Sequence, residues 1–395
     1  MNLEQKIIEI FEHQWSKIST DDLPVDLGEI LYQNYSDKVE IDFPSPKTEN
    51  LWRLKSKGCV GFIALNSSFA LRLSPKIKVN KLFQMLEYVY GFEIQVEDKL
   101  ELIYCDTIES FYERLAYLLS CQILERVKKG LYRAYIEQVE DLSVIRGHIN
   151  ASSFLRNPWN LKISCSYQRY TGNIVDNKIL AWALHLIKQS GLCDQSRLSI
   201  LKAYKALCEV VELSPCSSEV CINRNYNRLN DDYRRLHALC RFFIDSSSAS
   251  LKQGEYAMVS FLIDMDRLFE MFVASWLKKN LPEKYDLREQ DELYISPDMK
   301  PSRIDIVIYD EEGKEYCVLD TKYKTKFERD DLYQLDSYAS RKNCNEAILV
   351  YPVLPDNCPK ALFPNQNIQV RILVFSLDND LEQAGKQFKS ALFKL

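Results

Sequence analysis

The stretch with the clearest chemical pattern is EYCVLDTKYKTK, residues 315–326. Three apolar residues precede Asp320, and Lys322 follows two positions later. Side chains two positions apart in a β-strand point to the same face, so the pattern predicts an acid and a base on one face at a strand end. A carboxylate can hold a hard cation, and an ammonium group can stabilise negative charge that develops on a phosphate.

A second carboxylate is expected beside Asp320. Asp305 lies in another strand-like run, SRIDIVIYD, and the turn-like EEG separates the two runs. Neighbouring strands lie about 5 Å apart, so the two carboxylates can meet at one end of a sheet. Their repulsion makes this arrangement unfavourable unless a cation lies between them. We therefore predict a divalent cation with oxygen ligands, Mg²⁺ or alternatively Mn²⁺.

Two predicted helices flank these strands. Glu270, in RLFEMF of the preceding helix, is either a third metal ligand or its support, or an ordinary surface glutamate. Gln334, in YQLDSY of the following helix, is either a site residue or a residue that caps or solvates its helix. Tyr338 lies four residues after Gln334, so the two share a helix face.

Together these residues resemble the PD-(D/E)xK nuclease pattern, and Gln334 with Tyr338 resembles the RecB-type Q-x-x-x-Y helix. The resemblance implies a metal-dependent endonuclease whose metal ligands are Asp305, Asp320 and Glu270. It implies five catalytic residues in all, which are Asp305, Asp320, Lys322, Glu270 and Gln334. The sequence departs from the pattern at Arg303-Ile304, where Arg-Pro is usual.

Residues 1–105 predict a β-rich module. Apolar and polar residues alternate on both sides of the turn-like NSS between Gly58 and Leu73, as in a β-hairpin, and the helix-like KLFQMLEYVYG follows. At the N-terminus, apolar residues recur at helical spacing, which predicts an amphipathic helix. These residues are Leu3, Ile7, Phe11, Trp15 and Ile18.

Residues 106–250 predict a mainly helical region in which the strand-like LSVIRGHINAS and LKISCSYQRYT form a β insertion. Residues 251–395 predict an α/β nuclease domain with a mixed sheet. Its expected helices are VSFLIDMDRLFEMFVASWLKKNL and RDDLYQLDSYASR, and its expected strands are DELYIS, SRIDIVIYD, EYCVLDTKYK, EAILVYPV and IQVRILVFS. The predicted fold class is therefore multidomain α+β.

The composition is that of an ordinary globular protein. The 395 residues are 46% apolar and 27% charged, with a net charge of −5, which argues against a protein that coats DNA unaided. No apolar run is long enough to span a membrane, so we expect no membrane partner and a cytoplasmic location. The twelve cysteines lack C-x-x-C spacing and are expected to be reduced.

Several segments in order resemble McrC, the nuclease subunit of modified-cytosine restriction systems. They are GFIALNSSFALRLSPKI, MLEYVYG, VIRGHIN, YQRYTGNIVDNKILAWAL and RIDIVI…VLDTKYK…LYQLDSYA, which span roughly residues 51–352. The resemblance implies a type IV restriction endonuclease that cuts double-stranded DNA together with an McrB-like AAA+ GTPase ring. We expect the region before residue 105 to insert into that ring or cap it.

Two positions and one alternative function stay open. Arg146, in VIRGHIN, is either a contact to DNA or the partner or part of a tight turn, and His148 stands where many relatives carry arginine. Tyr338 is a second candidate contact to DNA or the partner. The chain lacks a G-x-x-x-x-G-K-[ST] phosphate loop, so GTP hydrolysis is left to the partner. The alternative function is a non-catalytic scaffold that docks on the GTPase and stimulates it.

Overall fold

The computed structural model divides into two compact units. The first consists of Met1–Phe111 with Ser260–Leu395, and the second of Tyr112–Val259. Helices and sheets are both present, which confirms the predicted α+β class. The structure describes residues 6–66, 68–92, 94, 96–103, 105–150, 161–248, 259–293, 302–358, 368–378 and 380–394.

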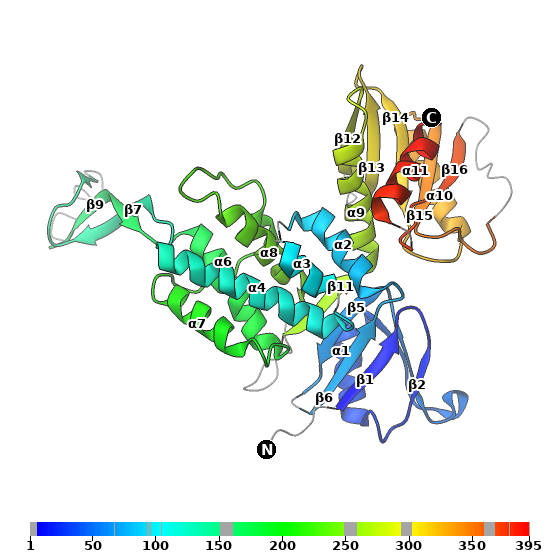
Figure 1. The fold of residues 1–395 in the computed structure, drawn as a ribbon, viewed down its shortest axis with the longest axis horizontal. Helices are drawn as coiled ribbons and strands as arrows, with labels where there is room; N and C mark the ends of the chain where they lie inside the picture. Colours follow the sequence, from blue (N-terminus) through cyan, green and yellow to red (C-terminus); the bar gives the residue numbers. More distant parts are fainter. Residues whose placement is uncertain are drawn as a thin grey trace. The chain divides into compact units, whose positions relative to one another are not determined.

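The first unit opens with a β-rich stretch, as predicted. Its elements are β1 (Lys6–Phe11), β2 (Ser16–Ile18), α1 (Val25–Tyr35), β3 (Val39–Asp42), β4 (Trp52–Ser56), β5 (Cys59–Ala64), β6 (Phe69–Ser74), α2 (Val79–Tyr90) and α3 (Val96–Ile103). β6 lies between β1, which runs parallel to it, and β5, which runs antiparallel (Figure 1). β4 lies between β2 and β3. The β5–β6 hairpin and the helix after it confirm the prediction for this segment.

The predicted N-terminal helix is wrong, because β1 and β2 occupy this segment. Ile8 and Ile10 are buried and their neighbours in β1 are exposed, which is the alternation of a strand. β-branched side chains favour strands, and pairing with β6 satisfies the backbone. The helical spacing included Ile7 and Phe11, which are exposed, and Leu3, which lies outside the described residues.

β11 (Ser260–Asp264) brings the chain back to the first unit. It pairs antiparallel with β5, with Leu262 opposite Gly61. Gly61 has a φ of 143°, and a Cβ there would lie 2.1 Å from the carbonyl oxygen of Phe261. Only glycine allows this close approach of two backbones. The pairing joins segments that lie about 200 residues apart in the sequence.

α9 (Met265–Asn280) begins directly after β11. The predicted helix over residues 259–281 is therefore wrong in its first residues, which form the strand. The carboxylate of Asp264 accepts a hydrogen bond of 3.1 Å from the backbone nitrogen of Arg267. A side chain that caps a helix in this way fixes where the helix starts.

A mixed sheet follows α9, as predicted. Its strands are β12 (Tyr285–Leu293), β13 (Ser302–Asp310), β14 (Glu315–Thr321), β15 (Glu346–Tyr351) and β16 (Gln369–Val374), which lie in this order across the sheet. β12, β13 and β14 are antiparallel, and β14, β15 and β16 are parallel. The predicted strand DELYIS begins too late, since β12 starts at Tyr285, and its last three residues lie outside the described residues.

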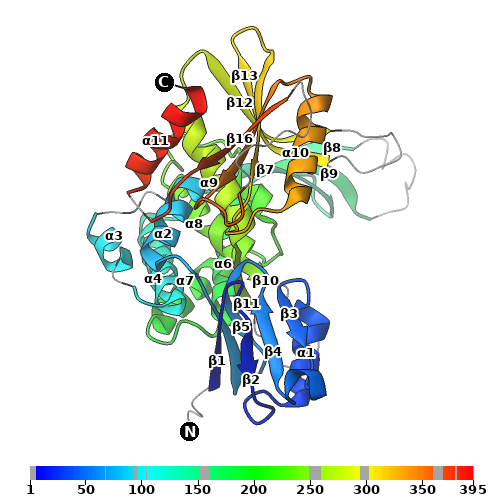
Figure 2. The ribbon, with the colours of Figure 1, turned by 90° about the vertical axis from the view of Figure 1, so that its right-hand side faces the viewer.

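Helices cover both faces of this sheet (Figure 2). α10 (Arg329–Arg341), whose bounds match the prediction, lies on one face, where Leu335 packs in a core with Val318 and Ala347. α9 and α11 (Leu381–Phe393) lie on the other face, where the ring of Phe375 contacts aromatic rings of both helices. α11 was not predicted.

The second unit is helical with a β insertion, as predicted. α4 (Ile108–Lys129) leads into it from the first unit. Its further elements are β7 (Ala134–Leu142), β8 (His148–Ile149), β9 (Ile163–Thr171), α6 (Val175–Ser190), α7 (Arg197–Cys208), α8 (Tyr233–Ser246) and β10 (Ser247–Ser248). The predicted strand LSVIRGHINAS is mostly wrong, because β7 ends at Leu142 and only two residues of the segment form β8. Its last two residues lie outside the described ones.

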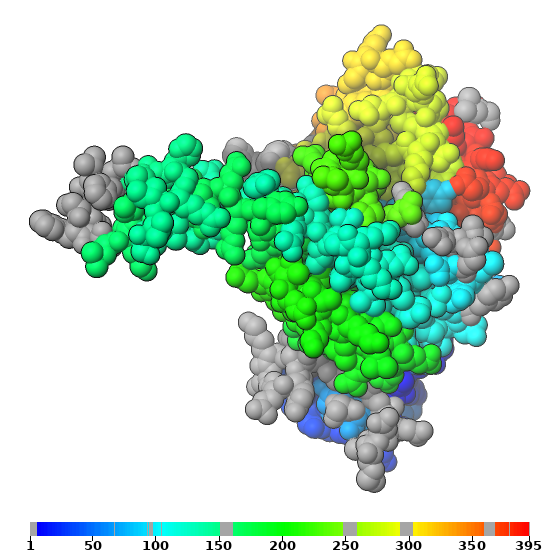
Figure 3. Space-filling view, turned by 60° about the vertical axis from the view of Figure 1, so that its left-hand side comes forward, coloured from blue at the N-terminus to red at the C-terminus, as the bar shows by residue number. Residues whose placement is uncertain are grey.

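β7, β8 and β9 form an antiparallel sheet, which we call the arm. The arm extends away from the helices of its unit (Figures 1 and 3). Asn177 of α6 ties its two ends together, since its side-chain nitrogen donates hydrogen bonds to the carbonyl oxygens of Tyr132 (2.9 Å) and Gly172 (2.7 Å). The Tyr233 hydroxyl of α8 donates to Asn177 (2.6 Å) and accepts from the Tyr132 nitrogen (3.0 Å). The base of the arm is therefore fixed to two helices.

Within the described part of the chain, no helix combines the length and the apolar character needed to cross a membrane. The twelve cysteines all lie among the described residues, and none of them forms a disulfide.

Candidate active site

The structure brings Asp305 and Asp320 together at one end of the sheet. Asp305 lies near the start of β13 and Asp320 near the end of β14. The two strands are antiparallel, and their register pairs Ile306 with Leu319, which are the neighbours of the two aspartates. The side-by-side placement expected from the sequence is therefore observed.

Asp305 is held by the residue that follows Asp320. One carboxylate oxygen, Oδ2, accepts hydrogen bonds from the backbone nitrogen of Thr321 (2.8 Å) and from its hydroxyl (2.9 Å). Burial raises the pKa of Asp305, and the bonds from Thr321 partly oppose this shift. The two strands are thus cross-linked at the site by a side chain as well as by backbone pairing.

Asp320 is almost completely buried, with 1% of its surface exposed. Burial, together with the charge of Asp305, raises the pKa of Asp320 to about 7. The Lys322 nitrogen lies 2.8 Å from Oδ2 of Asp320, and no other group donates a hydrogen bond to this oxygen. A buried carboxylate oxygen in this state can still bind a cation.

Lys322 lies just beyond β14, where its backbone nitrogen donates to the carbonyl oxygen of Val350 (2.8 Å). Its ammonium group donates to Oε1 of Gln334 (3.3 Å) and lies 3.9 Å from Oδ1 of Asp331. Burial opposes the charge on this group, but the surrounding carboxylates, Asp320 first, outweigh it and raise the pKa of Lys322. Lys322 is therefore charged at neutral pH.

Gln334 and Tyr338 continue this chain of contacts along α10. The side-chain nitrogen of Gln334 donates to the Tyr338 hydroxyl (2.7 Å). The predicted shared face is observed, and it places Gln334 beside Lys322. The ring of Tyr338 is buried in the core under the sheet, so a contact from Tyr338 to DNA stays a prediction.

Glu270 lies on α9 and lines the same cleft as the two aspartates. It accepts a hydrogen bond from the side chain of Gln290. Burial, and next the charge of Asp305, raises the pKa of Glu270 to about 7. Among the described residues, no three acidic, histidine or cysteine side chains have the spacing of a preformed metal site. A role for Glu270 as third ligand therefore stays a prediction.

The cleft has a volume of about 640 Å³ and is strongly acidic. Six of its lining residues are acidic and three are basic. The acidic ones are Asp264, Asp266, Glu270, Glu289, Asp305 and Asp320, and the basic ones are Arg267, Arg303 and Lys322. Cations are therefore needed before a polyanion can enter. This excess of negative charge, and the buried Oδ2 of Asp320 that already holds the Lys322 ammonium group, both fit a site for divalent cations.

Asp266 and Arg267 also line the cleft and were not predicted from the sequence. Both lie in the first turn of α9, and Asp266 lies four residues before Glu270, so the two acids share a helix face. Burial, and next the charge of Asp264, raises the pKa of Asp266 to about 6. The sequence IDMDR contains both acids that precede Glu270 and could have indicated an acidic helix start. The strand before α9 was not predicted, so the start of the helix was misplaced.

Arg146 lies in the arm, and its guanidinium group stacks on the ring of Tyr167 at 4.2 Å from the ring centroid. Arg146, Glu137 and His148 line a shallow cavity there. The structure thus places Arg146 in the second unit and the aspartate cleft in the first. Whether Arg146 contacts DNA or the partner stays a prediction.

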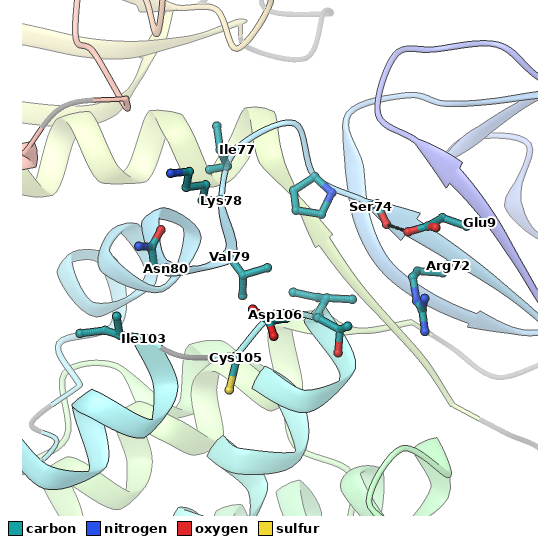
Figure 4. Close-up of a pocket in the computed structure, with 13 residues that line it drawn as sticks. Glu9, Arg72, Ser74, Ile77, Lys78, Val79, Asn80, Ile103, Cys105 and Asp106 are labelled. Carbon is teal, nitrogen blue, oxygen red and sulfur yellow. Dashed lines mark hydrogen bonds between the residues drawn. The ribbon is translucent and has the colours of Figure 1, made fainter.

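A further cavity, of about 370 Å³, lies in the first unit beside the starts of α2 and α4 (Figure 4). Arg72, Lys78 and Asp106 line it, and the Ser74 hydroxyl donates to Glu9 at its rim (2.6 Å). Arg72 is already paired with Glu109 at 2.5 Å. The cavity shares none of its lining residues with the aspartate cleft.

Comparison with known proteins adds a family match. The family model described as "McrBC 5-methylcytosine restriction system component" matches residues 54–352. A search of curated proteins finds no match.

Two solved structures are similar to this chain. The first is a chain of the refined half-complex from a tetradecameric assembly of Thermococcus gammatolerans McrB AAA+ hexamers with bound McrC. Its identity is 20% and its TM-score 0.59, over 98% of this chain and 99% of that chain. The second is the cryo-EM structure of the Thermococcus gammatolerans McrBC complex, with 18% identity and a TM-score of 0.43 over 72% of this chain and 89% of that chain. The first similarity supports the fold.

Proposed function

The chain belongs to the family of McrBC 5-methylcytosine restriction system components as an McrC-like member, and we propose that it is the subunit that cuts DNA. The predicted McrC resemblance is thereby confirmed. The observation that carries the proposal is the meeting of Asp305, Asp320 and Lys322 in one acidic cleft. The proposed reaction is hydrolysis of a phosphodiester bond in double-stranded DNA.

Five residues of the cleft have a part in the proposed reaction. Asp305 and Asp320 would hold Mg²⁺, or Mn²⁺ in its place, and Glu270 would bind it or support a ligand. When bound, the cation supplies positive charge that stabilises the phosphate in the transition state. Lys322 contributes a second positive charge on the same side, and Gln334 orients its ammonium group through their hydrogen bond.

The test is cleavage of modified-cytosine DNA by the full chain with its AAA+ partner, GTP and Mg²⁺. We expect Asp320→Ala to abolish cleavage, and Lys322→Ala to slow it by about 10²-fold, as the loss of a transition-state donor does. The matched control is Glu311→Ala, an exposed carboxylate in the turn between β13 and β14. Cleavage at the wild-type rate by Asp320→Ala would show that this cleft is not the active site.

Docking on a ring of AAA+ GTPase subunits is the second part of the proposal. It is motivated by the first solved structure, in which McrC is bound to McrB hexamers. The sequence favours the region before residue 105, and this stays a prediction. Deleting that region cannot test it cleanly, because the deletion removes β5, the partner of β11 in the same compact unit.

The arm is a further candidate for this docking. Its Tyr135 and Tyr170 form a cross-strand aromatic pair with centroids 5.0 Å apart, and both side chains are more than half exposed, as is Val139 on the same strand. Exposed apolar patches of this kind often bind partners. Large apolar groups in β1, Ile7 and Phe11, are also exposed, so the two regions can be compared directly.

Two double variants separate these docking regions. One is Tyr135→Ser with Tyr170→Ser in the arm, and the other is Ile7→Ser with Phe11→Ser in β1. The variant that loses co-purification with the partner ring and stimulation of its GTPase marks the docking region. The other variant serves as its control.

The alternative function is a non-catalytic scaffold that docks on the GTPase and stimulates it. The exposed apolar residues of the arm favour a docking role, but they are compatible with both functions. A scaffold would stimulate GTP hydrolysis equally well with Asp320→Ala and would never nick DNA in Mg²⁺ or Mn²⁺. Nicking by the wild-type complex that Asp320→Ala removes would exclude the scaffold.

A further inference from the structure

Two buried carboxylates share the ammonium group of Lys322. Asp320 lies 2.8 Å from it and Asp331, in the first turn of α10, lies 3.9 Å from it. Asp331 is 7% exposed. The sequence indicated Asp320 as a partner of Lys322 but gave Asp331 no role.

The two oxygens of Asp331 face different groups. Oδ2 lies 2.7 Å from the Lys324 nitrogen and accepts a hydrogen bond of 3.4 Å from the Tyr351 hydroxyl. Oδ1 faces Lys322. Asp331 lies three residues before Gln334, on the same face of α10, and Gln334 also accepts a hydrogen bond from Lys322. Oδ1 and Gln334 thus offer Lys322 a second set of acceptors.

A cation at Asp320 conflicts with the present position of Lys322. The ammonium group lies 2.8 Å from Oδ2 of Asp320, a buried oxygen to which no other group donates. Two cations on one buried oxygen repel each other strongly, because few water molecules screen them there. Lys322 therefore needs another acceptor whenever Asp320 binds a divalent cation.

We propose that Asp331 is a positioning residue that takes the ammonium group of Lys322 when Asp320 binds a divalent cation. This inference rests on the proposed function, because it assumes that the cation binds at Asp320. The lysine stem allows the short movement, and Lys322 stays charged and close to the cleft. Asp331 would thus link cation binding to the placement of the catalytic lysine. Lys324 weakens the attraction of Asp331 for Lys322, because it pairs with Oδ2 of the same carboxylate and offsets its charge.

The experiment measures Mn²⁺ binding by calorimetry with the full chain and no DNA. Asp331→Asn should weaken Mn²⁺ affinity by about tenfold, the range seen when groups behind metal ligands are removed. Asp330→Asn, an exposed neighbour on the same helix, controls for the loss of one negative charge. In a Lys322→Met background, Asp331→Asn should no longer weaken Mn²⁺ binding, because no ammonium group needs a second acceptor.

A Lys324→Met variant separates positioning from structural damage. Removing Lys324 breaks its ion pair with Asp331 and leaves the whole charge of this carboxylate to attract Lys322. It should therefore tighten Mn²⁺ binding, in the opposite direction to Asp331→Asn. Weaker binding in Lys324→Met would mean that the ion pair is only structural, and the inference would fail.

The outcomes also separate this inference from the proposed function. Wild-type affinity in Asp331→Asn, or an equal loss in the Lys322→Met background, would overturn the inference whether or not the complex cuts DNA. The absence of Mn²⁺ binding to the wild-type chain would overturn it too. Conversely, the expected pattern of affinities in a chain that never nicks DNA would uphold the role of Asp331 and refute the nuclease.

Discussion

Acid should destabilise the second unit through one buried histidine. His237 of α8 is 1% exposed. Its Nε2 lies 3.0 Å from the carbonyl oxygen of Asp176 and must donate to it, so Nδ1 accepts from the Tyr226 hydroxyl at 2.9 Å. Both ring nitrogens are thus engaged in the neutral form. Burial lowers the pKa of His237 to about 4.

The size of the effect follows from the two pKa values. An unfolded histidine has a pKa of about 6.5, so the unfolded chain binds a proton at a higher pH than the folded one. Stability is therefore complete above about pH 6.5 and is lost as the pH falls towards 4. At pH 5 the loss from this one residue is about 2 kcal/mol, and below pH 4 it levels off at about 3 kcal/mol.

The assay is hydrogen exchange in urea, with mass spectrometry of peptides from α6 and α8 at pH 7 and pH 5. The matched variant is His237→Gln, which keeps a donor and an acceptor but has no titrating group. Between the two pH values, the wild-type chain should lose about 2 kcal/mol more unfolding free energy than the variant. An equal loss in both proteins would refute the assignment of this pH dependence to His237.

Three further predictions concern the site, the arm and the packing of α11. Gln334→Ala should slow DNA cleavage more than Tyr338→Phe, measured as single-turnover rates, because only Gln334 bonds to Lys322; equal rates would return α10 to a packing role. Asn177→Ala should lower the free energy of unfolding by about 1–3 kcal/mol and speed amide exchange at the base of the arm, since it leaves the carbonyl oxygens of half-buried Tyr132 and buried Gly172 without their donor. Gly385→Ala should lower the melting temperature, because its Cβ would lie 2.2 Å from the Trp276 ring and overpacking costs about 1–3 kcal/mol; an unchanged melting temperature would show that α11 can shift freely.

The sequence was most informative where local pattern and tertiary environment agree. Asp305 interrupts one apolar run and Asp320 ends the next, and both runs have the composition and length of strands. The spacing of neighbouring strands was therefore enough to predict that the two carboxylates lie close together. The N-terminal segment shows the opposite case. The spacing of Ile7 and Phe11 fits a helix, but pairing with β6 decides the outcome, and β6 lies more than fifty residues away.

Other features depend on contacts that a single sequence does not display. Asp331 looks like one of two ordinary acids at a helix start, and only the fold brings it to Lys322. Likewise, the grouping of Met1–Phe111 with Ser260–Leu395 depends on the pairing of β5 with β11 and on the packing of α2 against α9. The domain boundaries predicted near residues 105 and 250 stay predictions. The two compact units of the structure divide the chain after Phe111 and after Val259.

The pairing of β5 with β11 also has a consequence for synthesis of the chain. The ribosome makes β5 first, and its partner β11 emerges only after the whole second unit, roughly 200 residues later. At about 5–20 residues per second, this leaves the edge of β5 without its partner for about 10–40 s. All six residues of β5 are buried in the finished protein, and an apolar strand edge of this kind readily pairs with other chains. A nascent chain that stalls within the second unit should therefore aggregate, and it should depend on chaperones that bind exposed strands.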